Sequence, residues 1–237
     1  MNQPLRVFIG FDPVETVAYN VLQHSIQRRA SRPVAVSPVA LSQLNGIMSR
    51  TRDPLQSTDF SFSRFLTPYL SNYEGWSLFM DCDMLVLDDI ANLFSLTDDR
   101  YAVMVIKHEH RPSETTKFLG TIQTKYPKKN WSSVVLFNNA RCKALTPEYV
   151  NSASGLELHQ FKWLGNDELI GELPHKWGHL VGYDAKVPVE ALSLLHFTIG
   201  GPYFDEYRNC DYAENWYAEK ESMLLCMQRS SAAKEAG

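Results

Sequence analysis

The chain has 237 residues, 44% of them hydrophobic, and a formal net charge of -4 at pH 7. This length suits one α/β domain, and this hydrophobic content excludes a generally disordered chain. The negative charge argues against a nucleic-acid-binding protein, which needs a basic face. The four cysteines form no C-x-x-C pattern. We therefore predict neither a structural zinc site nor a disulfide framework, and expect reduced thiols in the cytoplasm.

The residues before the first apolar segment lack the apolar core of a signal peptide, and no apolar run approaches the ~20 residues of a membrane span. We therefore expect a soluble protein without a transmembrane segment. Work on a lipid-linked acceptor, with peripheral membrane contact, is compatible with this expectation.

The first elements alternate between strand and helix. Residues 5–10 predict a short buried strand that ends at a glycine, and a helix that begins near Pro13 follows up to about Arg29. Residues 34–41 alternate weakly and favour a second strand. The polar stretch 42–59 predicts a loop.

The middle of the chain contains the strongest apolar pattern. Residues 62–70 favour a helix despite Pro68, and residues 76–80 predict a strand that stops at an acidic motif. The other elements that we expect are a strand at 84–87, a short helix at 90–96, strands at 101–106 and 134–137, a helix near 147–153, a turn at 165–166, a strand at 192–197 and a helix over 213–227. This order predicts an α/β protein with a largely parallel sheet. We expect one domain over 1–229 and a disordered tail over 230–237.

Asp81 and Asp83 follow the strand 76–80, at the carboxyl edge where open α/β sheets bind their ligands. Extended backbone puts both side chains on the same side of the chain, and two oxygen donors there suit Mg²⁺ or Mn²⁺, which can bind a diphosphate. The alternative is a solvated turn, because aspartate is common at strand ends. Apolar residues flank the motif on both sides in LFMDCDMLV, and two acids inside a hydrophobic run need a counter-charge. This context favours the metal site.

Four blocks of sequence carry a family resemblance. They are VFIGFD at 7–12, SRFLTPYL at 63–70, the D-x-D strand, and LHFTIGGP at 195–202. Together their order and spacing resemble the GT-A glycosyltransferases, most closely a bacterial group akin to glycosyltransferase family 8. The resemblance spans nearly the whole chain. It implies a single GT-A, Rossmann-like domain with a mixed, mostly parallel sheet, a UDP-sugar donor, a saccharide or glycolipid acceptor, retention of configuration and, by analogy, a role in bacterial surface-polysaccharide assembly.

In that family the D-x-D acids and a late histidine hold Mn²⁺, which implies Asp81, Asp83 and His196 as ligands of Mn²⁺ or Mg²⁺. Taken alone, a histidine in an apolar strand is more often a hydrogen-bonded core residue than a ligand. The glycines after it, Gly200 and Gly201, permit close backbone approach to a phosphate. The lysine that family members carry shortly afterwards is absent here, so the diphosphate contact must come from elsewhere or from backbone amides.

The family receives the nucleotide on its first strand. The residues expected at the nucleotide sugar are Phe8, Gly10, Phe11, Asp12, Arg64, Asp81, Cys82, Asp83, Gly200 and Gly201. Asp12 could instead cap the following helix. Arg64 lies on an otherwise apolar helix, and its guanidinium suits a diphosphate or donor-sugar oxygen. We therefore also count it among the candidate catalytic residues. The alternative is an arginine on the exposed surface. The glycines make no G-x-G-x-x-G motif, which disfavours a Rossmann dehydrogenase.

Residues 107–129 contain six lysines and arginines against two glutamates. A long segment between two strands is more often a functional loop than a solvated charge run, so we expect it to shape the acceptor site, for an anionic saccharide. The predicted acceptor residues are Lys107, Lys117, Trp131, Ser132 and Ser133. The indole of Trp131 could stack on a sugar ring or belong to the core.

Asp167 and Glu168 fall where related enzymes carry an acidic turn that faces the reactive carbon, and both are candidate catalytic residues. An inverting enzyme needs such a carboxylate as a base, whereas a retaining one needs groups that stabilise an oxocarbenium-like species. The alternative is a capped helix start with two acids.

Two rival functions remain open at this point. A sugar-phosphate nucleotidyltransferase shares this kind of sheet, but it usually opens with a glycine-rich, basic loop, and residues 7–17 contain no basic residue. A catalytically silent nucleotide- or sugar-binding protein would bind the donor without turnover.

Overall fold

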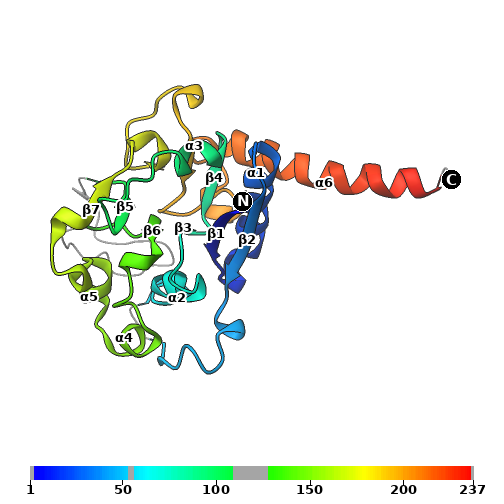
Figure 1. Cartoon of the computed structure of the whole chain (residues 1–237). Helices are drawn as coiled ribbons and strands as arrows, with labels where there is room; N and C mark the ends of the chain where they lie inside the picture. The colour runs from blue at the N-terminus through cyan, green and yellow to red at the C-terminus, as the bar shows by residue number, and fades with distance from the viewer. Residues whose placement is uncertain (1–2, 53–55, 109–127, 236–237) are drawn as a thin grey trace.

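The computed structural model describes residues 3–52, 56–108 and 128–235, and side chains up to residue 225. Nine strands form two sheets within these ranges (Figure 1). The strands are β1 (Leu5–Gly10), β2 (Val34–Val39), β3 (Trp76–Met80), β4 (Met84–Val86), β5 (Val103–Val105), β6 (Val134–Asn138), β7 (Ile170–Glu172), β8 (His179–Leu180) and β9 (Leu194–His196).

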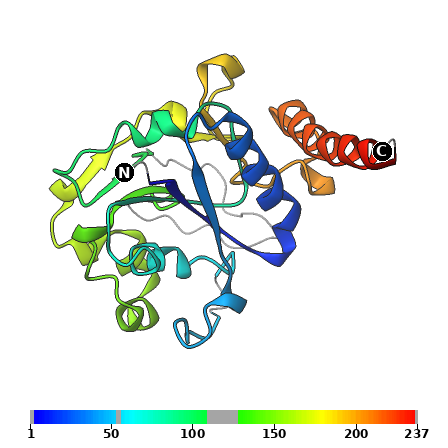
Figure 2. The ribbon, with the colours of Figure 1, turned by 45° about the vertical axis from the view of Figure 1, so that its right-hand side comes forward.

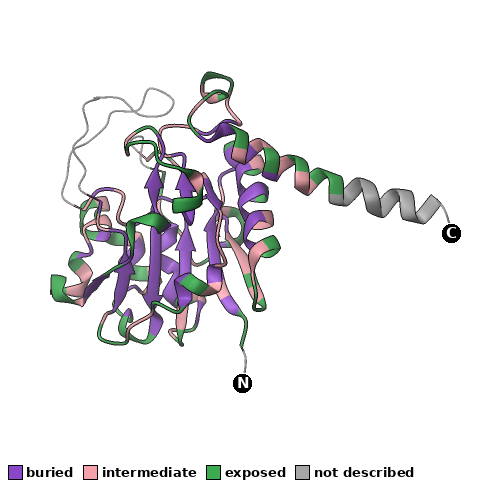
Figure 3. Ribbon diagram, turned by 90° about the horizontal axis from the view of Figure 1, so that it is seen from above, coloured by how far each residue is buried: buried purple, intermediate pink, exposed green. Residues whose placement is uncertain are grey.

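The central sheet has six strands in the order β2-β1-β3-β6-β5-β7. β1 is parallel to β2 and β3, and β5 is parallel to β7, whereas β6 runs antiparallel to both of its neighbours. The α/β class and the mixed, mostly parallel sheet are therefore confirmed. Every residue of β6 is buried, as expected for a strand covered on both faces (Figure 3).

The helices are α1 (Thr16–Arg29), α2 (Thr67–Leu70), α3 (Ile90–Phe94), α4 (Pro147–Ser152), α5 (Gly155–His159) and α6 (Ala213–Glu235). Short 3₁₀ helices span Pro13–Glu15, Leu41–Gln43, Ser63–Leu66, Asn139–Arg141, Lys162–Leu164, Asp167–Leu169, His175–Trp177, Val189–Ala191 and Asp205–Tyr207. α1 begins after a 3₁₀ turn whose first position is Pro13, as expected from its fixed φ. None of the helices in the described ranges is long and apolar enough to cross a membrane.

The small sheet has the order β4-β9-β8 and packs beside α1 (Figure 2). Its core joins Val21 of α1, Leu85 of β4, Leu195 of β9 and Trp216 of α6, all fully buried. The strand predicted at 84–87 forms as β4. It leaves the central sheet and pairs antiparallel with β9, a partner more than 100 residues later in the chain.

Two elements differ in extent from the sequence-based expectation. The helical segment 62–70 divides into the 3₁₀ helix Ser63–Leu66 and α2, with Pro68 in the first turn of α2. α6 extends away from the body and continues to Glu235, past residue 229, because its sequence offers strong helix formers and no glycine or proline before residue 237 (Figure 1). Most of the basic segment 107–129, including Lys117, lies outside the described residues.

Candidate metal centre

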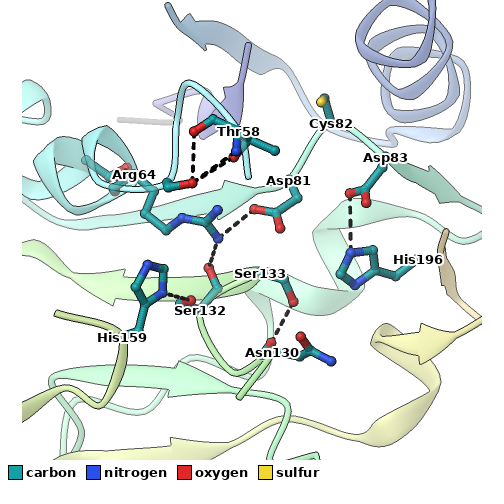
Figure 4. Close-up of polar contacts among 12 residues, drawn as sticks. Thr58, Arg64, Asp81, Cys82, Asp83, Asn130, Ser132, Ser133, His159 and His196 are labelled. Carbon is teal, nitrogen blue, oxygen red and sulfur yellow. Dashed lines mark hydrogen bonds and ion pairs between the residues drawn. The ribbon is translucent and has the colours of Figure 1, made fainter. Parts of the chain in front are cut away.

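Asp81, Asp83 and His196 come together between the two sheets. One ligand atom from each lies within 4.8 Å of the other two. Asp81 and Asp83 occupy the turn from β3 to β4, and the antiparallel pairing of β4 with β9 sets Met84 opposite His196 (Figure 4). The backbone N–H of Phe197 donates to the carbonyl of Asp83 at 2.9 Å. The pairing of two distant strands therefore brings the histidine to the acidic turn.

The donor set fits a hard divalent cation. Nε2 of His196 lies 3.3 Å from Oδ1 of Asp83, and both side chains are largely buried. Burial alone raises the pKa of Asp83, but the neighbouring His196 and then Arg64 outweigh it and hold that pKa below its ordinary value. Two carboxylates and one imidazole are ligands that Mn²⁺ and Mg²⁺ accept. His196 is buried, as in the core-residue alternative, but its imidazole contacts a carboxylate of the acidic turn.

Cys82 faces the opposite way from the two aspartates (Figure 4). Its thiol is fully buried and donates to Oε2 of Glu15 at 3.4 Å. Burial, followed by the charges of Glu15 and Asp83, raises the pKa of this thiol well above its ordinary value, so it stays protonated. A nucleotide contact at Cys82 could therefore come only from its backbone.

Arg64 is buried beside the acidic turn, so its alternative placement on the exposed surface is wrong. Its Nη1 lies 2.7 Å from Oδ1 of Asp81 and donates to the carbonyl of Ser132 at 2.9 Å. The guanidinium carbon lies 5.3 Å from the ring centre of Phe60 and 5.1 Å from that of Phe79. Two aromatic rings and two acceptors thus fix a positive charge at the acidic turn.

In the turn after β1, Asp12 and Gly10 both have structural roles. Oδ1 of Asp12 accepts from the backbone N–H of Val14 and caps the 3₁₀ helix, while Oδ2 accepts from the N–H of Asp59, both at 3.0 Å. A Cβ on Gly10 would lie 2.3 Å from ring carbons of Phe60, so any other residue there would force this ring to shift. These contacts account for the two residues structurally. The nucleotide-binding role of Asp12 and Gly10 stays a prediction.

The aromatic residues of the same segment pack inward. Phe8 belongs to the main core, and the ring of Phe11 meets that of Tyr19 edge to face at 5.4 Å. Their predicted contacts to a nucleotide therefore require backbone atoms at Phe8 and the partly exposed edge of Phe11.

Gly200 and Gly201 lie in the loop that follows His196. Cβ atoms built on them would approach the ring of Tyr207 to 2.3 Å and that of Tyr203 to 2.1 Å, respectively. Tyrosine packing on the loop therefore explains both glycines, in addition to the predicted approach of a phosphate, which stays a prediction.

Glu15 and Tyr203 are site residues that sequence reasoning missed. Oε1 of Glu15 accepts from the Tyr203 hydroxyl at 2.8 Å, directly behind the acidic turn. Burial, and then the charge of Asp83, raises the pKa of Glu15 to about 8. In the sequence, Glu15 resembles an ordinary acid in the first turn of a helix. Only the tertiary structure shows that it is buried.

Three of the predicted acceptor residues, Trp131, Ser132 and Ser133, lie in the turn before β6, and Lys107 follows β5. The ring centre of Trp131 lies 5.9 Å from Nζ of Lys107 and 6.0 Å from that of Lys128, while its indole N–H donates to the carbonyl of His108. The Trp131 ring is therefore half-buried between two lysines, and it packs against the main core.

The two serines that follow Trp131 are tied to the metal centre. Oγ of Ser132 lies 2.7 Å from Nδ1 of His159, and the carbonyl of Ser133 accepts from the N–H of Asp81 at 3.0 Å (Figure 4). His159, from α5, is a further residue that the sequence did not single out. The acceptor role of these side chains stays a prediction.

Asp167 and Glu168 begin a 3₁₀ helix whose first N–H groups are capped by the side chain of Asn166, which accepts from the N–H of Glu168 at 2.9 Å. The side chain of Asp167 is 73% exposed and forms an ion pair with Lys128. The capped-turn alternative thus describes the local structure. The pair with Lys128 also brings Asp167 near Trp131, because Lys128 lies over the Trp131 ring. The catalytic assignment of Asp167 and Glu168 stays a prediction.

Solved structures share this fold. The apo bifunctional glycosyltransferase WbbM matches 93% of this chain and 50% of its own at a TM-score of 0.64 and 13% identity. GlyE of Streptococcus pneumoniae TIGR4, a glycosyltransferase, matches 97% of this chain and 64% of its own at a TM-score of 0.62 and 16% identity. The galactosyltransferase LgtC, solved with donor and acceptor sugar analogs, matches 92% of this chain and 96% of its own at a TM-score of 0.60 and 12% identity. The chain thus spans half of WbbM and less than two thirds of GlyE.

No protein-family model matches the chain. A curated relative, Protein CDI of Arabidopsis thaliana, is 48% identical over 227 residues, which cover 93% of this chain and 87% of the relative. This chain has the GT-A glycosyltransferase fold, and it belongs to the family of Protein CDI.

Proposed function

We propose that this protein is a metal-dependent glycosyltransferase that moves a sugar from a nucleotide-diphosphate donor, a UDP-sugar, to a saccharide or glycolipid acceptor. The observation that carries the proposal is the cluster of Asp81, Asp83 and His196, with Arg64 paired to Asp81, at the carboxyl end of β3. Open α/β sheets bind ligands at that edge. Solved glycosyltransferases of the same fold support the reaction class.

Asp81, Asp83 and His196 would hold Mn²⁺ or Mg²⁺. A bound cation of this kind offsets the negative charge that develops on a departing nucleoside diphosphate. The guanidinium of Arg64 adds a fixed positive charge next to Asp81, and its bond to the carbonyl of Ser132 orients it. Because the rings of Phe60 and Phe79 lie beside the guanidinium and shield it from water, its charge acts in a medium of low polarity.

The acceptor would enter over Trp131, where an indole ring offers a sugar an apolar face and two lysines offer an anionic group a partner. Asp167 lies at this surface, but its carboxylate is engaged by Lys128. We propose retention of configuration, which needs no free carboxylate base at the acceptor hydroxyl, whereas an inverting mechanism does. The anomeric configuration of the product, read by proton NMR before mutarotation, tests this part.

The test is slow donor hydrolysis without acceptor, with Mn²⁺ or with a chelator. UDP-glucose, UDP-galactose and UDP-N-acetylglucosamine are incubated with the wild type, with Asp83→Asn and with Asp205→Asn, a matched change on a side chain that is 88% exposed. We expect Mn²⁺-dependent release of UDP from at least one donor, lost in Asp83→Asn and kept in Asp205→Asn.

Two other outcomes correspond to the rival functions. Release of pyrophosphate from a nucleoside triphosphate and a sugar phosphate identifies a nucleotidyltransferase. Mn²⁺-dependent donor binding without UDP release from any donor, even after days, leaves a silent binding protein and overturns the proposal.

A further inference from the structure

Glu15 is an acidic side chain in an unusual place. It ends the 3₁₀ helix before α1, where an acid is normally solvated, yet only 6% of its surface is exposed. Its two oxygens accept from different parts of the chain: Oε1 from the Tyr203 hydroxyl at 2.8 Å and Oε2 from the Cys82 thiol at 3.4 Å. Burial of a carboxyl group costs free energy unless hydrogen bonds compensate for the lost water. These bonds join the start of α1, the acidic turn and the loop after β9.

The two segments that Glu15 joins both belong to the proposed donor site. Cys82 stands between Asp81 and Asp83 and points away from them, so a bond to its thiol constrains the turn from behind (Figure 4). Tyr203 belongs to the loop that continues from His196, and its ring packs so closely on Gly201 that a Cβ there would lie 2.1 Å away. A displacement of the Tyr203 ring toward Gly201 would therefore push on the loop backbone.

A second tyrosine holds the same loop independently of the acidic turn. The Tyr217 hydroxyl, from α6, donates to the carbonyl of Pro202 at 2.7 Å. This bond is as short as that from Tyr203, but it leads to α6. The loop thus has one tether to Glu15 and one to the C-terminal helix, which provides a built-in control.

We propose that Glu15 is a positioning residue that couples the acidic turn to the loop after His196, so that cation binding and nucleoside-diphosphate binding reinforce each other. This inference rests on the proposed function. A cation held by Asp81 and Asp83 would fix the turn that carries Cys82. The bonds of Glu15 to Cys82 and Tyr203 would pass that constraint to the loop at Gly200 and Gly201, where the diphosphate is expected.

The test measures a coupling factor, the ratio of the UDP dissociation constants without and with saturating Mn²⁺. By linkage, the ratio of the Mn²⁺ dissociation constants without and with saturating UDP must equal the same factor. Electron paramagnetic resonance of free Mn²⁺ measures this second ratio independently. We expect Tyr203→Phe, which deletes one hydroxyl, to lower the factor about five-fold, the value of one hydrogen bond between uncharged groups. Glu15→Gln keeps an acceptor oxygen for Tyr203, and we expect it to lower the factor less.

Tyr217→Phe is the matched control and should leave the coupling factor within about two-fold of wild type, the scatter of an uncoupled site. The Glu15→Gln/Tyr203→Phe double variant should be no worse than Tyr203→Phe, because both changes break one connection. Melting temperatures confirm that each variant is folded.

A wild-type coupling factor in folded Tyr203→Phe overturns the inference, and so does an equal loss in Tyr217→Phe, which would indicate general loosening of the loop. If the wild type binds no UDP even with Mn²⁺, the proposed function itself fails and the inference fails with it.

Discussion

Arg64→Gln should strengthen Mn²⁺ binding while it weakens the metal-free fold. Nη1 of Arg64 lies 2.7 Å from Oδ1 of Asp81. A cation about 2.1 Å from that oxygen, on the side away from Arg64, would be about 5 Å from Nη1. At an effective dielectric constant of about 20, a charge of +2 and a charge of +1 at this distance repel by about 7 kcal/mol, an upper limit because the guanidinium charge is delocalised. If only a fifth of this repulsion, about 1.4 kcal/mol, opposes Mn²⁺ binding in the wild type, its removal in Arg64→Gln makes binding about ten-fold tighter.

The same substitution removes a charge-assisted bond from Asp81. The two side chains are 7% and 15% exposed, so solvent screening is limited, and we expect a loss of about 1.5–3 kcal/mol from the free energy of unfolding. Urea denaturation measures this loss in a chelator, and Mn²⁺ titration followed by electron paramagnetic resonance measures the affinity.

Arg28→Gln is the control, because it removes the same charge from a side chain that is 53% exposed and pairs with Glu219 of α6. It should leave Mn²⁺ affinity unchanged. Unchanged or weaker Mn²⁺ binding in folded Arg64→Gln would refute the electrostatic reasoning, since orientation of Asp81 by the arginine would then outweigh repulsion of the cation.

Three further predictions concern the same region. His196→Asn should weaken Mn²⁺ binding by at least about ten-fold, because loss of a residue that merely supports a metal ligand already costs about this much. The same resonance titration measures it. In the metal-free wild type, the pKa of Glu15 rises on folding from 4.5 to about 8. Its stabilising contribution is full below pH 4.5 and is lost as the pH rises through 8, by at most about 1.4 kcal/mol per unit. Urea unfolding of Glu15→Gln should lack this slope, and an equal slope would contradict the assignment. Gly10→Ala should cost about 1–3 kcal/mol, because Phe60 must shift; an unchanged melting temperature would contradict it.

The strands and the acidic turn were predictable because their signals are local. β1 and β3 are mostly apolar, and the interruption of the apolar run around β3 by Asp81 and Asp83 already indicates a counter-charge. The position of His196 followed from the family resemblance, and the register of β4 with β9 places it where a third ligand belongs.

The remaining contacts depend on tertiary structure that no local pattern contains. Glu15 and Tyr203 are 188 residues apart, and the buried bond between them has no periodicity that could reveal it. The separation of β4 into a second sheet was missed because its sequence simply continues the apolar pattern of β3. The pairing of Arg64 with Asp81 likewise arises from packing of the 3₁₀ helix Ser63–Leu66 against the sheet edge.

The most direct test of the central claim is the melting temperature of the protein with UDP, with Mn²⁺, and with both, for the wild type and Asp83→Asn. A ligand that binds only the folded state stabilises it by about 2.7 kcal/mol at 100 times its dissociation constant. We predict an upshift with UDP that requires Mn²⁺ and is absent in Asp83→Asn. No upshift with UDP or any other nucleoside diphosphate, with Mn²⁺ or Mg²⁺ present, would contradict the account and leave the acidic turn with a structural role alone.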